Sequence, residues 1–233
     1  MSFDFLVSLF FPRRCLACGK TLRAGALCPA CRGKITTART FFCGRCGSPL
    51  PGPKLHDPRR TCHPDFPYVL GAAGSYKDET LRALVHALKF RGVRAAAEPL
   101  ASIMAEYALP FKTDLLRYVA MPIPLSRERF RIRGFNQSER IATRFAEYFG
   151  LPVATKCLVR IKHAKPQSET TSVAERRENI RGCFAVADAA AACGKNVLLV
   201  DDVSTSGATF LEAARALKDA HAADIIALAA AKA

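Results

Sequence analysis

Apolar residues follow two different periods along this chain, and the two alternate from residue 68 onward. Stretches with apolar residues at helical spacing predict amphipathic helices at residues 81–90, 95–107 and 136–149, and after Gly207. Short apolar runs between them predict strands at residues 118–124, where the strand runs into a loop, and at 183–186, 197–200 and 225–228. Because this alternation is typical of parallel sheets, we expect an α/β fold with a mostly parallel sheet flanked by helices on both faces.

The first twelve residues are apolar, but they do not resemble a targeting or membrane segment. They lack a basic n-region and a small-residue cleavage site, and they are too short to span a bilayer. We expect a short helix that packs on the folded protein and ends at Pro12. Without an export signal or a membrane span we expect a cytoplasmic protein, whose closely spaced cysteines bind metal rather than form disulfides.

Cysteine is unevenly distributed, with seven of the ten residues in the first 62 positions. A chain of 233 residues can hold a small module plus a domain of ordinary size. We therefore predict a Cys-rich zinc-binding module with a short N-terminal helix at residues 1–67, followed by the α/β domain at residues 68–233.

Two cysteine pairs, each followed by glycine, have the form of zinc knuckles. They begin at Cys15 and Cys43, whereas a third pair, starting at Cys28, is typical of a helix start. Nine residues separate the first pair from the third, so one tetrahedral structural zinc site is predicted from Cys15, Cys18, Cys28 and Cys31. In an interleaved alternative, Cys15 and Cys18 would instead join the pair that begins at Cys43.

A second zinc site is less complete in the sequence. It would use Cys43, Cys46 and Cys62, and the fourth ligand is open among three nearby residues, His56, His63 and Asp65. Either a histidine completes this site or the second metal is absent. Four protein ligands leave no position for water, so the expected role of zinc is structural.

The run at residues 197–209 joins an apolar strand, two acids and a small hydroxylated loop. The carboxylates of Asp201 and Asp202 are expected where the strand ends and can accept hydrogen bonds from sugar hydroxyls. A loop that opens a helix directs backbone N–H groups and a positive dipole end at a phosphate. The expected phosphate-binding residues are Val203, Ser204, Thr205, Ser206, Gly207, Ala208 and Thr209.

An arginine-rich segment at residues 122–137 is predicted to form a second anion-binding loop. Four arginines stand at alternate positions between residues 127 and 133, and guanidinium groups suit polyphosphate oxygens. A polar segment follows at residues 160–181. We expect either a flexible loop that closes over a bound ligand or a solvated connector.

The run at residues 197–209 resembles the phosphoribosyl-pyrophosphate (PRPP) signature of type I phosphoribosyltransferases. The sequence Arg-Gly-Phe-Asn-Gln at residues 133–137, with the N-terminal cysteine pairs, narrows the resemblance to the ComF/GntX family, which is associated with bacterial competence. The resemblance covers nearly the whole chain and also includes residues 88–90, Gln167, Arg177 with Asn179, and Phe184. It implies a type I phosphoribosyltransferase-like fold preceded by a double zinc ribbon.

The resemblance implies that the chain binds PRPP with Mg²⁺ and transfers the phosphoribosyl group to a nitrogen nucleophile, releasing pyrophosphate. Asp201 and Asp202 would be the catalytic pair, binding the ribose hydroxyls and stabilising positive charge at the anomeric carbon. Mg²⁺ would be held mainly by pyrophosphate, ribose and water. The implied pyrophosphate loop contains Pro124, Leu125, Arg127 and Arg133. No general base stands out, so the acceptor and the occurrence of catalysis stay open.

A competing hypothesis is that the chain binds single-stranded DNA as part of the DNA-uptake machinery and keeps the PRPP fold as a scaffold or sensor. The net charge is +15, and residues 1–67 hold eleven Lys and Arg against three Asp and Glu. Phe41 and Phe42 stand beside Arg39 and Arg45 and could stack on bases, although they could equally belong to a core.

Overall fold

A five-stranded sheet forms the centre of the protein in a computed structural model that describes residues 13–50, 62–161 and 181–233. The strand order is β3-β4-β9-β8-β5. The four strands from β4 to β5 are parallel, and β3 is antiparallel to β4. Their bounds are β3 Phe41–Cys43, β4 Val69–Ser75, β5 Tyr118–Pro122, β8 Asn196–Ser204 and β9 Ile225–Lys232.

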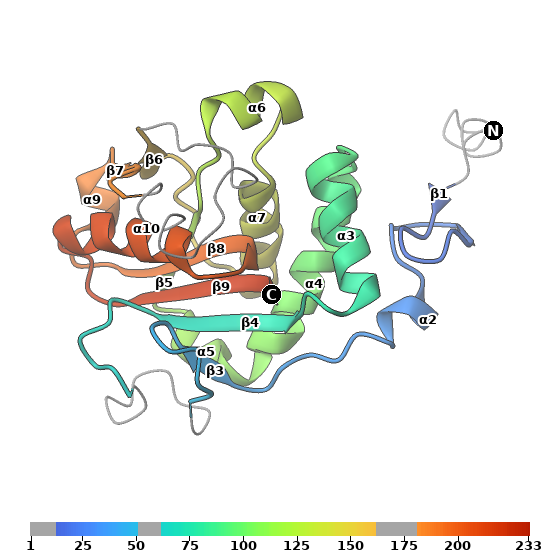
Figure 1. Ribbon diagram of the computed structural model, residues 1–233, viewed down its shortest axis with the longest axis horizontal. Coiled ribbons are helices and arrows are strands. Elements are labelled where there is room, and N and C mark those ends of the chain that lie inside the picture. The colour runs from blue at the N-terminus through green and yellow to red at the C-terminus, as the bar shows by residue number, and fades with distance from the viewer. Residues whose placement is uncertain (1–12, 51–61, 162–180) are drawn as a thin grey trace.

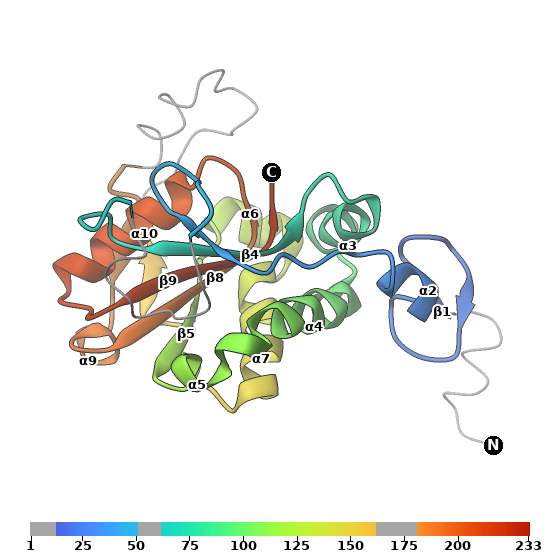
Figure 2. The ribbon, with the colours of Figure 1, turned by 90° about the horizontal axis from the view of Figure 1, so that it is seen from below.

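Helices cover both faces of this sheet (Figure 2), which confirms the predicted fold class. One face packs against α3 (Glu79–Phe90), α4 (Ala97–Ala108) and α7 (Gln137–Phe149). The other face packs against α10 (Ala208–Asp219) and a hairpin of β6 (Leu158–Arg160) and β7 (Phe184–Val186). Shorter helical elements are η2 Arg94–Ala96, η3 Leu109–Phe111, α5 Lys112–Leu115, α6 Arg127–Arg133 and α9 Ala189–Ala192.

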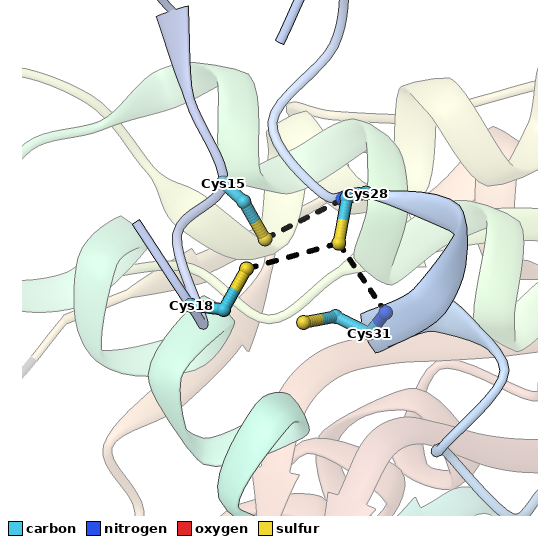
Figure 3. A group of neighbouring side chains, drawn as sticks. All are labelled: Cys15, Cys18, Cys28 and Cys31. Atoms are coloured by element: carbon cyan, nitrogen blue, oxygen red, sulfur yellow. Dashed lines mark hydrogen bonds between the residues drawn. The ribbon is translucent and has the colours of Figure 1, made fainter. Parts of the chain in front are cut away.

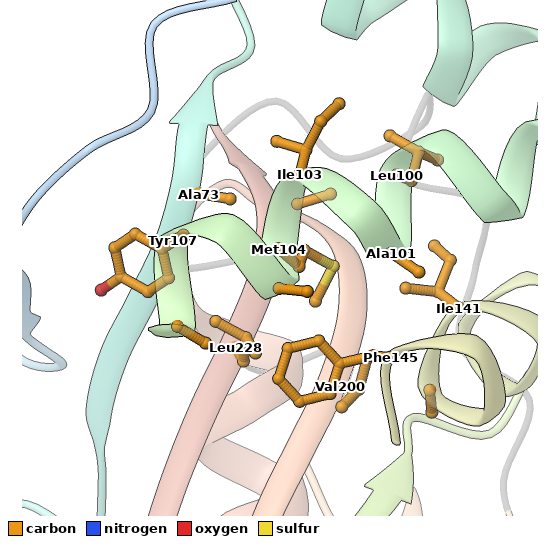
Figure 4. Packing of buried hydrophobic residues seen from close by; sticks show 14 of the residues in the cluster. Ala73, Leu100, Ala101, Ile103, Met104, Tyr107, Ile141, Phe145, Val200 and Leu228 are labelled. Carbon is orange, nitrogen blue, oxygen red and sulfur yellow. The ribbon is translucent and has the colours of Figure 1, made fainter. Parts of the chain in front are cut away.

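The central strands are apolar on both sides because both faces are covered. Val200 and Leu228 pack against Met104 of α4 and Phe145 of α7 (Figure 4). Leu199, next to Val200 in β8, belongs to the cluster on the opposite face. Each large apolar side chain buried here contributes about 1.5–3 kcal/mol to folding. The long apolar runs in the sequence therefore correspond to strands without a solvent face.

The cysteine-rich region lies partly beside the sheet and partly within it (Figure 1). Residues 13–32 form a small module with β1 (Arg13–Arg14), β2 (Thr21–Leu22) and α2 (Pro29–Arg32). The chain then runs back to the body, where Phe41 pairs with Gly71 across β3 and β4. The proposed boundary between residues 67 and 68 therefore falls between two paired strands.

Residues 1–12, for which a packed helix is predicted, lie outside the described residues. So do most of the polar segment at residues 160–181, including Gln167, Arg177 and Asn179, and the candidate ligand His56. Among the helices of the described ranges, none has the length and apolar character needed to cross a bilayer.

Candidate ligand site and metal centres

The acidic pair lies within a strand rather than after one. Strand β8 continues to Ser204 because β9 extends equally far, so Asp201 pairs in register with Ala229 and Ser204 with Lys232. The expectation that the strand ends at Val200 is therefore wrong on this side. On the other side, pairing of β8 with β5 stops at Val200, opposite Pro122. The two carboxylates therefore lie just beyond the last residue of β8 that pairs with β5.

Asp202 forms a buried ion pair with a lysine from α3. Lys89 Nζ lies 2.8 Å from Asp202 Oδ1, and the aspartate side chain is only 2% exposed. Burial acts to lower the pKa of Lys89, but the carboxylates of Asp202 and Asp201 raise it above its ordinary value. The second oxygen, Oδ2, and the nearby Ser204 Oγ are buried and have no hydrogen-bond partner among the described residues. Buried polar atoms are normally satisfied, so these two atoms point to a missing donor or ligand group.

Asp201 is held by different groups. The Ser138 hydroxyl donates to Asp201 Oδ1 over 2.6 Å, and the same oxygen accepts the backbone N–H of Asp202 over 2.9 Å. Loss of contact with water raises the pKa of Asp201 to about 7, and the negative charge of Asp202 adds to this increase. Lys89 and the Ser138 hydroxyl act in the opposite direction.

The loop after β8 leads into a helix without a side-chain cap. Gly207 is the N-cap of α10 with a φ of 71°, and no described side chain bonds to the first N–H groups of the helix. The Tyr68 hydroxyl donates to Gly207 O over 3.2 Å. A Cβ on Gly207 would lie 2.7 Å from this hydroxyl, so both backbone conformation and space require glycine here. The helix start can accept an anion.

The arginine-rich segment is helical where a loop was predicted. Ser126 caps α6 by accepting the N–H of Arg129 over 3.3 Å, and Gly134 ends the helix at a φ of 74°. Four-residue spacing therefore places Arg129 and Arg133 on one face, and Arg127 and Arg131 on another. Arg127 and Arg133 were expected to act together in the pyrophosphate loop, but this spacing places them on different faces of the helix.

Arg133 interacts electrostatically with both members of the acidic pair. Burial lowers the pKa of Arg133, whereas the carboxylates of Asp202 and Asp201 raise it and the charge of Arg129 lowers it further. Its guanidinium donates to Gln137 Oε1 at the start of α7. The turn between α6 and α7 is held by Asn136, whose amide donates to Ile123 O over 3.0 Å. Pro124 and Leu125 lie in the connection that this bond closes, directly after Ile123.

Sequence reasoning assigned no role to Lys89 or Ser138. For Lys89 a signal exists, because it lies one turn after Val85 on the apolar stripe of α3. A lysine at such a position must either reach water or meet a buried acid. For Ser138 no local pattern marks the contact with Asp201, since it depends on how α7 packs on the sheet.

The first cysteine cluster gathers the four residues of the predicted sequential site. Cys15, Cys18, Cys28 and Cys31 turn their sulfur atoms toward one another (Figure 3), and all four Sγ atoms lie within 4.8 Å of each other. Cys18 Sγ and Cys28 Sγ are 3.8 Å apart, the distance expected between two thiolates on one tetrahedral zinc at about 2.3 Å from each sulfur. Cys28 also caps α2, which confirms the predicted helix start.

The second cluster contains three cysteines and a histidine. Cys43, Cys46, Cys62 and His63 present ligand atoms within 4.8 Å of one another, so His63 takes the position that was left open. His63 Nδ1 lies 3.4 Å from Cys43 Sγ and 3.3 Å from Cys62 Sγ. Asp65 is not part of this group. Three thiols and one imidazole are a donor set that suits a closed structural zinc site.

Comparisons with known proteins agree with this two-part architecture. A double zinc ribbon domain matches residues 6–63, and a phosphoribosyl transferase domain matches residues 133–233. Competence protein F of Haemophilus influenzae is 29% identical over 223 residues, covering 90% of this chain and 92% of its own. The chain is therefore similar to the ComF/GntX family over nearly its whole length.

Other similar proteins are named as competence or DNA utilization proteins. Competence protein ComFC of Bacillus subtilis is 28% identical, with 82% of this chain and 77% of its own covered. The DNA utilization protein YhgH of Salmonella typhimurium is 29% identical, with 90% and 92% covered. Among solved structures, a glutamine PRPP amidotransferase from B. subtilis is 20% identical, with a TM-score of 0.40 over 58% of this chain and 26% of its own. The cysteine clusters and the ribbon match together indicate zinc binding.

Proposed function

We propose that this protein binds PRPP with Mg²⁺ and transfers its phosphoribosyl group to a nitrogen nucleophile, releasing pyrophosphate. The observation that carries this proposal is the group of buried polar atoms at the end of β8. Asp202 Oδ2 and Ser204 Oγ have no partner among the described residues, and they directly precede the uncapped start of α10. A phosphorylated sugar supplies hydroxyl donors for the first and a phosphate for the second.

Each part of the substrate then has a matching group in the chain. Residues 203–209 would hold the 5′-phosphate through backbone N–H groups and hydroxyls. Asp201 and Asp202 would accept hydrogen bonds from the ribose hydroxyls and stabilise the positive charge that develops at the anomeric carbon. Lys89 pairs with the Asp202 carboxylate over 2.8 Å and so holds it in position.

The leaving group would meet the arginines of α6. Arg133, and Arg129 on the same helix face, would neutralise pyrophosphate, and Arg127 lies one turn before Arg131 on the other face. Mg²⁺ fits this donor set because carboxylates and phosphates are the oxygen ligands it prefers, and it would supply charge neutralisation on pyrophosphate. Pyrophosphate, the ribose hydroxyls and water would supply most of its ligands, beside the acidic pair.

Calorimetric titration with Mg-PRPP tests the site directly. The wild-type chain should bind, and Asp201→Asn combined with Asp202→Asn should abolish binding, because each substitution removes the negative charge and replaces one acceptor oxygen by an NH2 donor that opposes the ribose hydroxyls. Asp219→Asn, which alters an exposed carboxylate in the last turn of α10, is the matched control and should bind like wild type. Equal affinity in the double variant would rule out this site. Pyrophosphate release with candidate nitrogen bases then separates an enzyme from a sensor.

A second candidate function is binding of single-stranded DNA, for which the structure indicates a different surface from the one that the sequence predicts. Phe41 is 3% exposed and packs on Tyr107 and Phe111, so it belongs to the core rather than to a stacking surface. Phe42 is half-buried beneath the Lys232 ammonium. The cysteine-rich region therefore does not present this aromatic pair to a nucleic acid.

Two exposed aromatic side chains lie instead in helices that also contribute to the candidate site. Phe90, at the end of α3, is 67% exposed, and Phe130 of α6 is 49% exposed. Arg94 lies over the Phe135 ring at 5.2 Å, so the segments after α3 and after α6 meet here (Figure 1). Exposed arginines are close to both phenylalanines in sequence, namely Arg91, Arg127, Arg129 and Arg131. Aromatic faces among cations suit the stacked bases and phosphates of a single strand.

Fluorescence anisotropy with single-stranded DNA tests this second function. Phe90→Ala with Phe130→Ala should weaken binding, by about 1–3 kcal/mol for each stacked base lost. The control is Leu116→Ala, which removes an exposed apolar side chain that lies away from Phe90 and Phe130. Phosphate contacts predict that affinity falls steeply as salt rises. Weak binding that does not change with salt would contradict the proposal.

A further inference from the structure

The second cysteine knuckle lies directly against the candidate phosphate loop. Gly44, between Cys43 and Cys46, is pressed onto Tyr68, so that a Cβ there would lie 2.6 Å from Tyr68 O. The hydroxyl of the same Tyr68 donates to Gly207 O, at the N-cap of α10. One tyrosine therefore connects the knuckle with the start of the helix that would receive the 5′-phosphate.

A second connection runs through the end of β9. Lys232 Nζ donates to Gly47 O over 3.2 Å and lies 4.3 Å from the centre of the Phe42 ring. Lys232 also pairs in register with Ser204, and the N–H of Ala233 donates to Ser204 O over 2.9 Å. The knuckle is thus connected to Ser204 as well as to Gly207 of the loop.

The metal ligands stand on both sides of the contact with Tyr68. Cys43 and Cys46 flank Gly44, whereas Cys62 and His63 begin the segment that leads to Phe66 and Tyr68. A Cβ on Gly44 would also lie 2.7 Å from the Phe66 ring, and the Phe66 and Tyr68 rings are 5.1 Å apart. An ion bound to these four ligands would clamp both halves of the contact together. Without it, the knuckle would be held by β3, the hydrogen bond from Lys232 to Gly47 O and aromatic contacts.

We infer that the metal at Cys43, Cys46, Cys62 and His63 positions the phosphate loop through Tyr68, so that occupancy of this site controls ligand affinity. Tyr68 is a positioning residue in this arrangement, because it contacts Gly207 rather than the ligand. The first cluster has no such role. Its polar connection to the body runs through Arg32 and Glu106, on the module side of α4. The inference concerns the geometry of the loop, and its effect on PRPP rests on the proposed function.

Two matched variants separate the clusters, with amide hydrogen exchange across residues 203–211 as the first readout. Cys62→Ser with His63→Ala should lose one zinc per chain and accelerate exchange in this segment. Cys18→Ser should lose zinc from the first cluster and leave exchange at residues 203–211 unchanged. Titration with Mg-PRPP is the second readout, and the first variant should bind at least about fivefold more weakly, the lower end of typical coupling between sites.

Tyr68→Phe keeps both metal sites and removes only the hydroxyl, so it tests the connection even if the metal-site variant does not fold. It should retain full zinc content, accelerate exchange near Gly207 and weaken Mg-PRPP binding about two- to tenfold, as expected for one hydrogen bond. Unchanged exchange at residues 203–211 in both variants would overturn the inference. Failure of the wild-type chain to bind Mg-PRPP would overturn the proposed function instead, because the exchange measurement needs no ligand.

Discussion

The two cysteine knuckles share one backbone design and differ at the two residues between their cysteines, of which the first decides how closely the knuckle can pack. In each, the glycine after the second cysteine has a positive φ, 74° at Gly19 and 73° at Gly47, and donates its N–H over 2.8 Å to the carbonyl of the first cysteine. The residue after the first cysteine is Leu16 in one knuckle and Gly44 in the other. Leu16 is half-buried and packs against the main core, whereas Gly44 has no room for a side chain.

This difference shows how one metal-binding unit can serve two purposes. The first knuckle belongs to a module that stands beside the body and contacts it through ordinary side chains. The second is built into the edge of the sheet, and Tyr68 and Lys232 connect it with the candidate ligand loop. The glycine in the second knuckle is the signature of that close contact.

The largest expected difference is between two ion pairs, one at the candidate ligand site and one beside the first cysteine module. Lys89→Met should lower the free energy of unfolding by about 3–5 kcal/mol, because it leaves the Asp202 carboxylate buried without a partner. Glu106→Gln breaks the ion pair that Arg32 makes near the module, and there the expected loss is about 0–1 kcal/mol since both side chains reach water. Urea unfolding at neutral pH measures both. Equal losses would mean that the Asp202 site is not the buried centre described above.

A smaller effect should follow from filling the space at Gly44. Gly44→Ala should lower the free energy of unfolding by about 1–3 kcal/mol, because the new methyl group would collide with Tyr68 O and the Phe66 ring, and neither can move away freely. It should also weaken Mg-PRPP binding, whereas Leu16→Ala in the first knuckle should leave that affinity at the wild-type value. Thermal unfolding and calorimetric titration provide the two readouts. Weaker ligand binding in Leu16→Ala but not in Gly44→Ala would reverse the roles assigned to the knuckles.

Sequence reasoning reached the parts of this architecture that depend on local pattern. Strands β5, β7, β8 and β9, the long helices on both faces and the first cluster were predicted, because periodicity and ligand spacing are encoded within short windows. Strands β3, β4 and β6 were not predicted. The fit of the second cluster to Gly207 could not be predicted, since Tyr68 and Gly207 are 139 residues apart in sequence. The same holds for the pair of Lys89 with Asp202. The α6 helix was missed because Ser126 was not recognised as a cap.

The smallest expected effect is a pH dependence confined to the ligand end. The pKa of Asp201 is about 7, so lowering the pH from 8 to 6 should protonate it and weaken Mg-PRPP binding by up to about tenfold. Stability should change in the opposite direction. A raised carboxyl pKa stabilises the folded chain below the ordinary aspartate pKa, and this contribution is lost as pH rises through about 7.

Asp201→Asn separates this effect from titration of PRPP itself. The variant keeps the phosphate titration of the ligand but should lose the additional pH dependence contributed by Asp201. Titrations of both proteins between pH 6 and 8, with zinc content measured as a control for the cysteine clusters, provide the comparison. Identical pH profiles would show that Asp201 does not titrate in this range.

A crystal structure of the complex with Mg-PRPP tests the central claim most directly. We expect the 5′-phosphate at the backbone N–H groups of residues 205–209, the ribose hydroxyls at Asp201 and Asp202, and the pyrophosphate beside Arg133. We also expect zinc at both cysteine clusters, with the second in contact with the loop through Tyr68. PRPP bound elsewhere, or a loop at residues 203–209 that holds no phosphate at saturating PRPP, would contradict the account.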